Sequence, residues 1–199
     1  MTTPATPSEP VVFGTSIEAL VDRALRGRMT PQAVAGIQAL GIDLGRLKVA
    51  YDYTTWVKLQ QLLVDLFYPR LTREQALQQL GRDYIQGLEH TLVGKALFAM
   101  SRLSGVRKML ERMTRNVRTA NNYMESHLEP LPDGTFLLHY QVVPALVPAM
   151  QKLPAPSPHY FHGILQAAMG ASGARDIRVD LEQIHAADLR WSYRVAYSG

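Results

Sequence analysis

Residues 110–143 read LERMTRNVRTANNYMESHLEPLPDGTFLLHYQVV, and the hydrophobic period changes inside them, near residue 122. Over about 100 residues before this point, apolar residues recur at helical spacing. After it, segments 123–128, 135–143, 177–184 and 189–197 alternate as strands do, with one helical stretch between the second and the third. The change predicts an α+β fold, in which an N-terminal block of about five to six helices precedes a four-stranded antiparallel sheet in β-β-α-β-β order.

Capping and stop signals divide the helical block. Thr30-Pro31 supplies a cap and a proline at the first helical position, and residues 72–75 (TREQ) have the pattern of a capping box. Pro69 ends the preceding helix because proline cannot continue it. Helices are expected at about 16–26, 31–40, 53–68, 73–90, 92–101 and 106–119, and in the second part at 160–169.

Length and composition limit the class of protein. At 199 residues the chain fits one α+β domain, which we place at 11–199, and the Thr/Pro-rich residues 1–10 predict a disordered leader. No apolar run approaches the roughly 18 residues of a membrane span and no signal peptide is recognised, so the cytoplasm is the expected location. Cysteine is absent, which excludes disulfides, thiolate metal sites and a cysteine nucleophile. The net charge of +4 is too small to predict nucleic-acid binding.

Several short sequence motifs, taken with their order and spacing, resemble those of a known family. They are Tyr68-Pro69, Leu80-Gly81-Arg82, Thr91 with Gly94, Leu110 with Arg112, Asn121-Asn122-Tyr123, and Gly163 with Gly170-Ala171. Together they resemble a paralogous family of uncharacterised proteins expanded in myxobacteria, over the chain from about Val11 to its C-terminus. That family implies no activity that can be transferred to this chain.

The order of helices and strands is also similar, at greater distance, to the superfamily of heme-nitric-oxide/oxygen-binding domains. The superfamily includes vinyl-reductase-type regulatory domains and a family of vesicle-tethering subunits with a buried acyl chain. This resemblance implies an apolar cavity between helices and sheet, which is the theme that the members share. It is an analogy at the level of the fold and assigns no function by itself.

The sequence departs from the heme-binding branch at the positions that hold heme. That branch needs an axial histidine near the end of the helical block, where this chain has Val117, and no histidine lies between Thr91 and Ser126. Its Tyr-x-Ser-x-Arg motif is replaced by residues 140–144, YQVVP, so that only the tyrosine remains. We therefore expect no heme ligated in that way, and no cofactor. Because the chain has no cysteine, an acyl chain attached to that residue is excluded, whereas a non-covalent apolar ligand is not.

Aromatic residues and methionines from both halves are candidates for a cavity lining. We select Tyr84, Phe98, Met113 and Tyr140, and the two tyrosine hydroxyls would orient a lipid-like or planar ligand. The wider set adds Trp56, Phe67, Met100, Tyr160, Phe161 and Met169. The alternative is that all of these residues are ordinary core.

A basic face is expected on the helix at 106–119. Val106, Leu110, Met113 and Val117 form its apolar stripe. The remaining surface carries Arg107, Lys108, Arg112, Arg115 and Arg118, preceded by Arg102 and opposed only by Glu111. This face would dock an acidic protein partner or a phosphate-bearing ligand. The alternative is a solvated face whose arginines pair with nearby carboxylates, and the lack of interleaved aromatic residues disfavours nucleic acid.

Two histidine pairs are candidate metal ligands. If the hairpin pairs about Asp133, His127 and His139 lie opposite each other. They would share their face with Glu125, Glu129 and Gln141. An exposed cross-strand His/Glu pair is the alternative that we favour. His159 and His162 lack a third nearby ligand, so we predict no metal site.

The sequence contains no Gly-x-Ser-x-Gly elbow, no glycine-rich phosphate loop and no His-Glu-x-x-His motif, so an enzyme is not predicted. Two hypotheses follow. The favoured one is a non-enzymatic cytoplasmic regulatory or sensor module that binds a small apolar ligand between helices and sheet. The alternative is a protein-interaction module that docks an acidic partner through the basic helix, with a homodimer left open.

Overall fold

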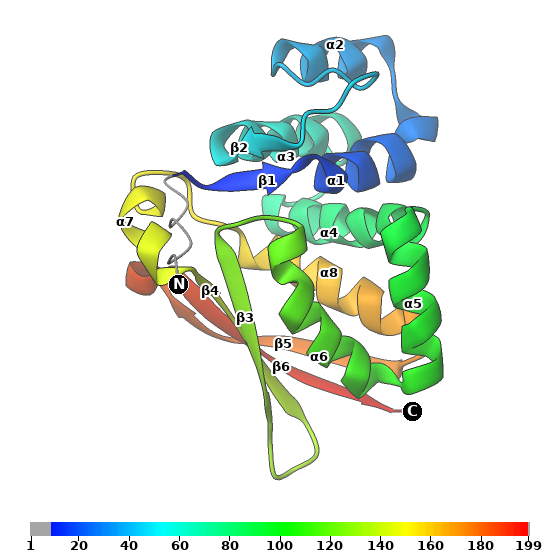
Figure 1. Cartoon of the computed structure of the whole chain (residues 1–199), viewed down its shortest axis with the longest axis vertical. Helices are drawn as coiled ribbons and strands as arrows, with labels where there is room; N and C mark the ends of the chain where they lie inside the picture. The colour runs from blue at the N-terminus through cyan, green and yellow to red at the C-terminus, as the bar shows by residue number, and fades with distance from the viewer. Residues whose placement is uncertain (1–8, 199) are drawn as a thin grey trace, which may run out of the picture.

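The predicted α+β architecture is confirmed by the computed structural model, in which helices precede a four-stranded antiparallel sheet (Figure 1). The structure describes residues 9–198, apart from the side chains of Val93, Arg102 and Leu103. Residues 1–8 of the predicted leader lie outside the described residues. Pro10, from the end of that segment, is buried, and its carbonyl accepts a hydrogen bond of 3.0 Å from the Tyr53 amide.

The first part of the chain adds a small two-stranded sheet. β1 (Val11–Phe13) pairs antiparallel with β2 (Ala50–Asp52), which is too short to show a strand period. Between these strands lie α1 (Gly14–Ile17), the π-helix η1 (Glu18–Ala24), the 3-10 turn η2 (Arg26–Arg28) and α2 (Pro31–Ala39). The first expected helix is therefore divided, and its middle has π rather than α hydrogen bonding.

Four longer helices form the body of the helical block. They are α3 (Tyr53–Phe67), α4 (Arg73–Glu89), α5 (Leu92–Ser104) and α6 (Val106–Asn116), and the 3-10 turn η3 (Val117–Thr119) follows. Thr72 and Gln75 form the predicted capping box, and the Thr91 hydroxyl caps α5 by accepting from the Gly94 amide at 3.0 Å. Gly105, with a φ of 82°, separates α5 from α6. No helix among the described residues is long and apolar enough to span a membrane.

The larger sheet consists of two hairpins joined through their second strands. β3 (Met124–Pro130), β4 (Phe136–Val142), β5 (Arg175–His185) and β6 (Arg190–Ser198) stand in the spatial order β3-β4-β6-β5. The connection from β4 to β5 contains η4 (Pro144–Leu146), α7 (Val147–Met150) and α8 (Pro158–Ala171), and η5 (Ala186–Asp188) links β5 to β6. The register assumed for the first hairpin is confirmed, because His127 pairs with His139. Leu138 and Tyr140 point toward the helices and are buried.

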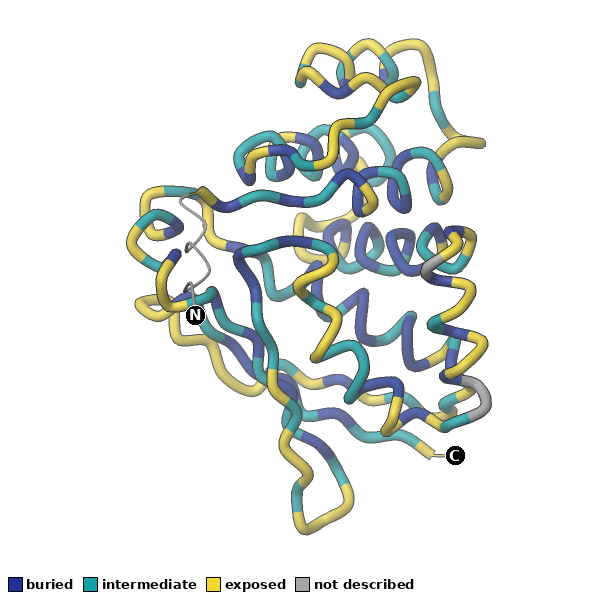
Figure 2. Tube along the Cα trace, viewed as in Figure 1, coloured by how far each residue is buried: buried dark blue, intermediate teal, exposed yellow. Residues whose placement is uncertain are grey.

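Two glycines allow α4 and α8 to cross at close range (Figure 1). A Cβ atom on Gly81 would lie 2.1 Å from the Tyr160 carbonyl oxygen, and one on Gly163 would lie 1.9 Å from the Gln78 carbonyl oxygen. No side chain fits at such distances, so both positions require glycine. α8 in turn packs on β5. Burial is densest along α4, α8 and the helix-facing side of the sheet, whereas α2 and the tip of the β3–β4 hairpin are mostly exposed (Figure 2).

Candidate functional site

A cavity of about 890 Å³ lies between the helical block and the sheet. Its wall includes residues from α1, η1, α3, α4, α5, α6, β4 and α8. The structure brings the four predicted side chains together in this wall: Tyr84 from α4, Phe98 from α5, Met113 from α6 and Tyr140 from β4. The volume falls within the range of about 300–1,000 Å³ that is usual for small-molecule sites.

Aromatic rings make up much of the wall. The rings of Tyr140 and Phe161 are 4.9 Å apart between centroids, and those of Trp56 and Tyr160 are 5.9 Å apart. Met100 also lines the cavity. Two members of the wider predicted set do not: Met169 is buried in the core, and Phe67 lies under the Arg28 guanidinium, 4.8 Å from its ring centroid.

Sequence reasoning missed Tyr53 and Tyr123, which also line the cavity. Their rings meet edge to face, with centroids 4.9 Å apart. Strict strand alternation would place Tyr123 on the outer face with Glu125. The Asn121 carboxamide oxygen accepts hydrogen bonds from the amides of Tyr123 (3.1 Å) and Met124 (2.8 Å), so the chain turns before β3 begins and both side chains are buried. In the sequence, Asn121 was the one signal for such a turn.

The tyrosine hydroxyls of the wall differ in their hydrogen bonding. Tyr53 donates to the Pro154 carbonyl at 2.8 Å. Ser16 donates to the Ala120 carbonyl at 3.1 Å, and its hydroxyl also lowers the pKa of Tyr84 against the larger effect of burial. Burial raises the pKa of Tyr84 and of the other tyrosines of the wall, so all of these hydroxyls keep their protons near neutral pH.

The cavity opens beside α5. Leu92 and Met100 border it although they are 89% and 55% exposed. Exposed apolar side chains at a cavity mouth allow an apolar ligand to enter without crossing a charged barrier. Charged groups stand at the same rim: Lys95 is exposed, and Arg23 pairs with Glu18 at 2.8 Å.

The wall lacks the ligands of the heme-binding branch. Val117 lines the cavity at the position matched to the axial histidine, and its side chain carries no donor atom. Among the described residues of the lining, His90 is the single histidine, and it is exposed at the end of α4. Val142 and Pro144 stand where the Tyr-x-Ser-x-Arg motif has its serine and arginine, so this segment offers no arginine for a propionate. These residues do not fit a heme held as in that branch.

The residues predicted as a partner-binding face lie on α6 and η3. They are Arg107, Lys108, Arg112, Arg115 and Arg118. Two of them pair with carboxylates: Arg107 with Glu111 at 3.1 Å and Arg118 with Glu125 at 2.8 Å. The side chain of Arg102 lies outside the described residues. The charge of this face is therefore lower than its composition suggests.

Two of the other three cations of this face have uncharged partners. Arg112 donates to the Ser104 hydroxyl at 3.1 Å, and Arg115 donates to the Glu111 carbonyl at 3.2 Å. Within the described part of the chain, no carboxylate pairs with Lys108, Arg112 or Arg115. These three side chains are the part of the face that an acidic partner could use.

The first histidine pair lies on the outer face of the sheet. The rings of His127 and His139 stack with centroids 6.3 Å apart, and His139 Nε2 is 3.4 Å from a Glu129 carboxylate oxygen. Among residues 9–198, no three His, Cys, Asp or Glu side chains gather closely enough to hold a metal. The geometry is that of a cross-strand His/Glu contact.

The second pair, on α8, contacts two different residues of α4. His159 lies 3.7 Å from Glu74, and His162 Nδ1 lies 3.4 Å from the Gln78 amide nitrogen. The ring of His162 also meets that of Tyr193 on β6. Burial lowers the pKa of His162, and the positive charge of Arg82 lowers it further.

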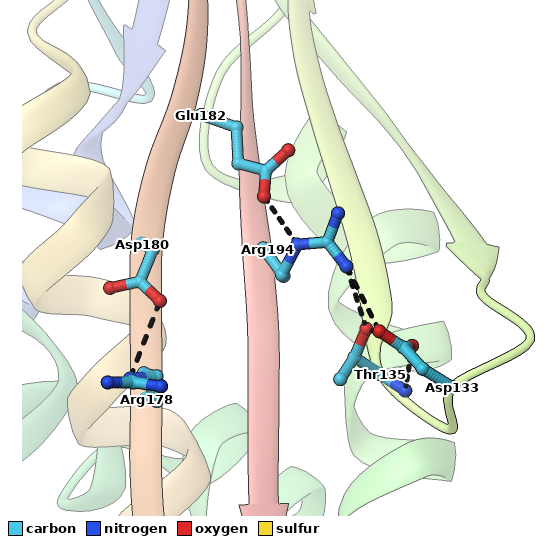
Figure 3. A network of polar contacts seen from close by, with 6 residues as sticks. All are labelled: Asp133, Thr135, Arg178, Asp180, Glu182 and Arg194. Atoms are coloured by element: carbon cyan, nitrogen blue, oxygen red, sulfur yellow. Dashed lines mark hydrogen bonds and ion pairs between the residues drawn. The ribbon is translucent and has the colours of Figure 1, made fainter.

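Ion pairs cross the outer face of the sheet from β5 to the β3–β4 turn (Figure 3). Arg194 of β6 contacts both Glu182 of β5 and Asp133 of the turn, the latter at 3.2 Å. Arg178 and Asp180 pair along β5 at 3.6 Å. The charged groups of this face are thus bound to one another.

Solved structures identify the fold. An H-NOX protein from S. oneidensis in the Fe(II)NO ligation state aligns with a TM-score of 0.64 over 94% of this chain and 99% of its own, at 11% identity. An Fe(II) unliganded H-NOX variant from K. algicida aligns with a TM-score of 0.62 over 94% of this chain and 97% of its own, at 13% identity. An oxygen complex of an H-NOX domain related to soluble guanylate cyclases aligns with a TM-score of 0.63 over 94% of this chain and 95% of its own, at 14% identity. The predicted distant resemblance is confirmed at the level of the fold.

Comparison of sequences is more specific than comparison of structures. No curated protein matches the sequence significantly. The profile of one family, described as protein of unknown function (DUF2378), matches residues 10–197 and so nearly the whole chain. The chain therefore belongs to the DUF2378 family of proteins of unknown function.

Proposed function

We propose that this chain is a non-enzymatic regulatory or sensor module that binds a small apolar ligand in the cavity between helices and sheet. The observation that carries the proposal is the cavity, whose volume is about 890 Å³. Close-packed protein cores contain few voids larger than a water molecule, so a space of this size needs an occupant or a use. Proteins of the same fold have been solved with NO and with oxygen bound, which supports a binding role.

Native mass spectrometry of the protein purified from its own host, with an absorbance spectrum of the same sample, tests the proposal. We expect a stoichiometric extra mass. In the absence of a bound molecule, the neutral fluorophore N-phenyl-1-naphthylamine should bind and raise the melting temperature, because a ligand of the folded state stabilises it by mass action. A clean apo mass together with no binding of the fluorophore would contradict the proposal.

A cavity-filling variant shows where binding occurs. Met113→Trp places a larger ring into the wall and should abolish fluorophore binding. Lys108→Trp, on the exposed side of the same helix, is the matched control and should leave binding unchanged. Equal binding by both variants would place the fluorophore elsewhere on the protein.

A second candidate function follows from the unpaired cations of α6. Lys108, Arg112 and Arg115 have no carboxylate partner within the described residues, which suits the docking of an acidic protein partner or a second copy of the chain. Binding to a poly-glutamate peptide should weaken with added salt and with Arg112→Glu plus Arg115→Glu. Sedimentation of the same two proteins tests the homodimer, and unchanged behaviour in both assays would exclude this face.

A further inference from the structure

We propose that the cavity is built for an uncharged ligand with a hydrogen-bond acceptor, such as a carbonyl oxygen, and that the hydroxyls of Tyr123 and Tyr140 hold this oxygen. The inference rests on the proposed function, because it names the ligand chemistry of the same cavity. The two tyrosines reach the wall from the residue before β3 and from β4. Two separate parts of the chain therefore contribute the same chemical group.

These two hydroxyls lack partners inside the protein. The hydroxyls of Tyr123 and Tyr140 form no hydrogen bond within the described residues, although each side chain is only 3% exposed. Buried tyrosine hydroxyls normally find a partner, because an unmade hydrogen bond inside a protein is costly. The neighbouring hydroxyl of Tyr53 follows that rule. The Tyr160 hydroxyl also lacks a partner, but protein atoms enclose it so completely that no ligand atom in the cavity can contact it.

The missing partner must be an acceptor. Burial raises the pKa of both phenols, so each keeps a proton to donate. A carbonyl, ester or amide oxygen on the ligand would receive it. A purely hydrocarbon ligand would fill the space but leave the two donors unsatisfied.

The acceptor must also be uncharged. The cations of the lining, Arg23, His90 and Lys95, are all exposed at its rim, and Arg23 already pairs with Glu18. None of them can neutralise an anion placed among the tyrosine rings. A buried charge without a partner is far more costly than a buried carbonyl that accepts a hydrogen bond.

Two probes of nearly equal shape test this inference: benzophenone, which has a carbonyl, and diphenylmethane, which has none. Their dissociation constants follow from displacement of N-phenyl-1-naphthylamine. Single substitutions Tyr123→Phe and Tyr140→Phe each remove one donor and keep the ring. Tyr53→Phe is the matched control, because its hydroxyl already donates to the Pro154 carbonyl.

We expect Tyr123→Phe and Tyr140→Phe each to weaken benzophenone binding about fivefold, the value of one neutral hydrogen bond. Diphenylmethane binding should stay within experimental error, and Tyr53→Phe should change neither constant. The infrared carbonyl stretch of ¹³C-labelled bound benzophenone should lie at low frequency in the wild type and rise in both variants.

If both probes bind and no variant changes the benzophenone constant or the stretch, this inference is wrong, while the apolar cavity of the proposed function stands. If neither probe nor the fluorophore binds, the proposed function and the inference both fail. A change in one variant alone would overturn the assignment of two donors.

Discussion

The polar groups on the two faces of the larger sheet differ in whether they have partners within the protein. On the outer face, Arg194 joins Glu182 and Asp133 in an ion-pair network at the surface (Figure 3). On the inner face, Tyr140 of β4 turns its hydroxyl toward a cavity where no protein group receives it. Bulk water satisfies the outer groups, whereas the inner hydroxyl faces the cavity. If the proposed ligand binds there, unused hydrogen-bonding capacity marks the binding face better than charge does.

The largest effect is expected from a substitution that disturbs the packing of α8 against α4, because α8 covers the inner face of the sheet. Gly163→Ala places a Cβ 1.9 Å from the Gln78 carbonyl oxygen, so α8 must move away from α4. We expect a loss of more than about 3 kcal/mol in the free energy of unfolding, measured by urea denaturation. Gly170→Ala in the same helix is the control: its Cβ would meet nothing closer than 3.7 Å, and it should be neutral or slightly stabilising. Equal effects would show that the close crossing is unimportant.

A second test compares a tyrosine hydroxyl that has a hydrogen-bond partner with one that has none. Tyr53→Phe removes the hydrogen bond to the Pro154 carbonyl and should cost about 1 kcal/mol of unfolding free energy. Tyr160→Phe removes a hydroxyl without a partner, so the ligand-free protein should be at least as stable as the wild type. Denaturation of both ligand-free variants measures the difference. A marked loss in Tyr160→Phe would mean that its hydroxyl is already bonded.

A smaller effect concerns pH, through His162 between α8 and the sheet. Burial lowers its pKa in the folded state below the ordinary value of 6.5, so below pH 6.5 the unfolded chain binds more protons than the folded one. Stability should therefore fall as the pH decreases from 6.5 through the folded-state pKa, and level off below it. His162→Gln should flatten this part of the stability profile. An unchanged slope in the variant would assign the pH dependence to other groups.

The smallest effect is expected on the outer face. Arg194→Gln breaks the contacts with Glu182 and Asp133, but these groups are at the surface, where water and salt screen them. We expect a smaller loss of stability than for Tyr53→Phe, and no difference from the wild type in concentrated NaCl. A loss as large as that of Tyr53→Phe would show that the outer network is structurally as important as the inner hydrogen bonds.

Much of the fold could be predicted because its signals are local. The period change near residue 122, the cap at Thr72 and the turn at Asp133 each act within a few residues of chain. The strand β2 could not be predicted, because its three residues form a strand only by pairing with β1, about 40 positions earlier. Tyr123 was assigned no role for a related reason: the turn at Asn121 breaks the alternation on which the assignment depended.

For the candidate site, the sequence by its own patterns decided which faces are apolar, and so pointed to Tyr84, Phe98, Met113 and Tyr140. Only the tertiary structure decided that these side chains surround a cavity, and which hydroxyls in its wall are satisfied. Tyr53 finds its acceptor 101 residues away at Pro154, while Tyr160 finds none. Hydrogen-bond partners and voids depend on how distant elements pack, and no local pattern of residues encodes that packing.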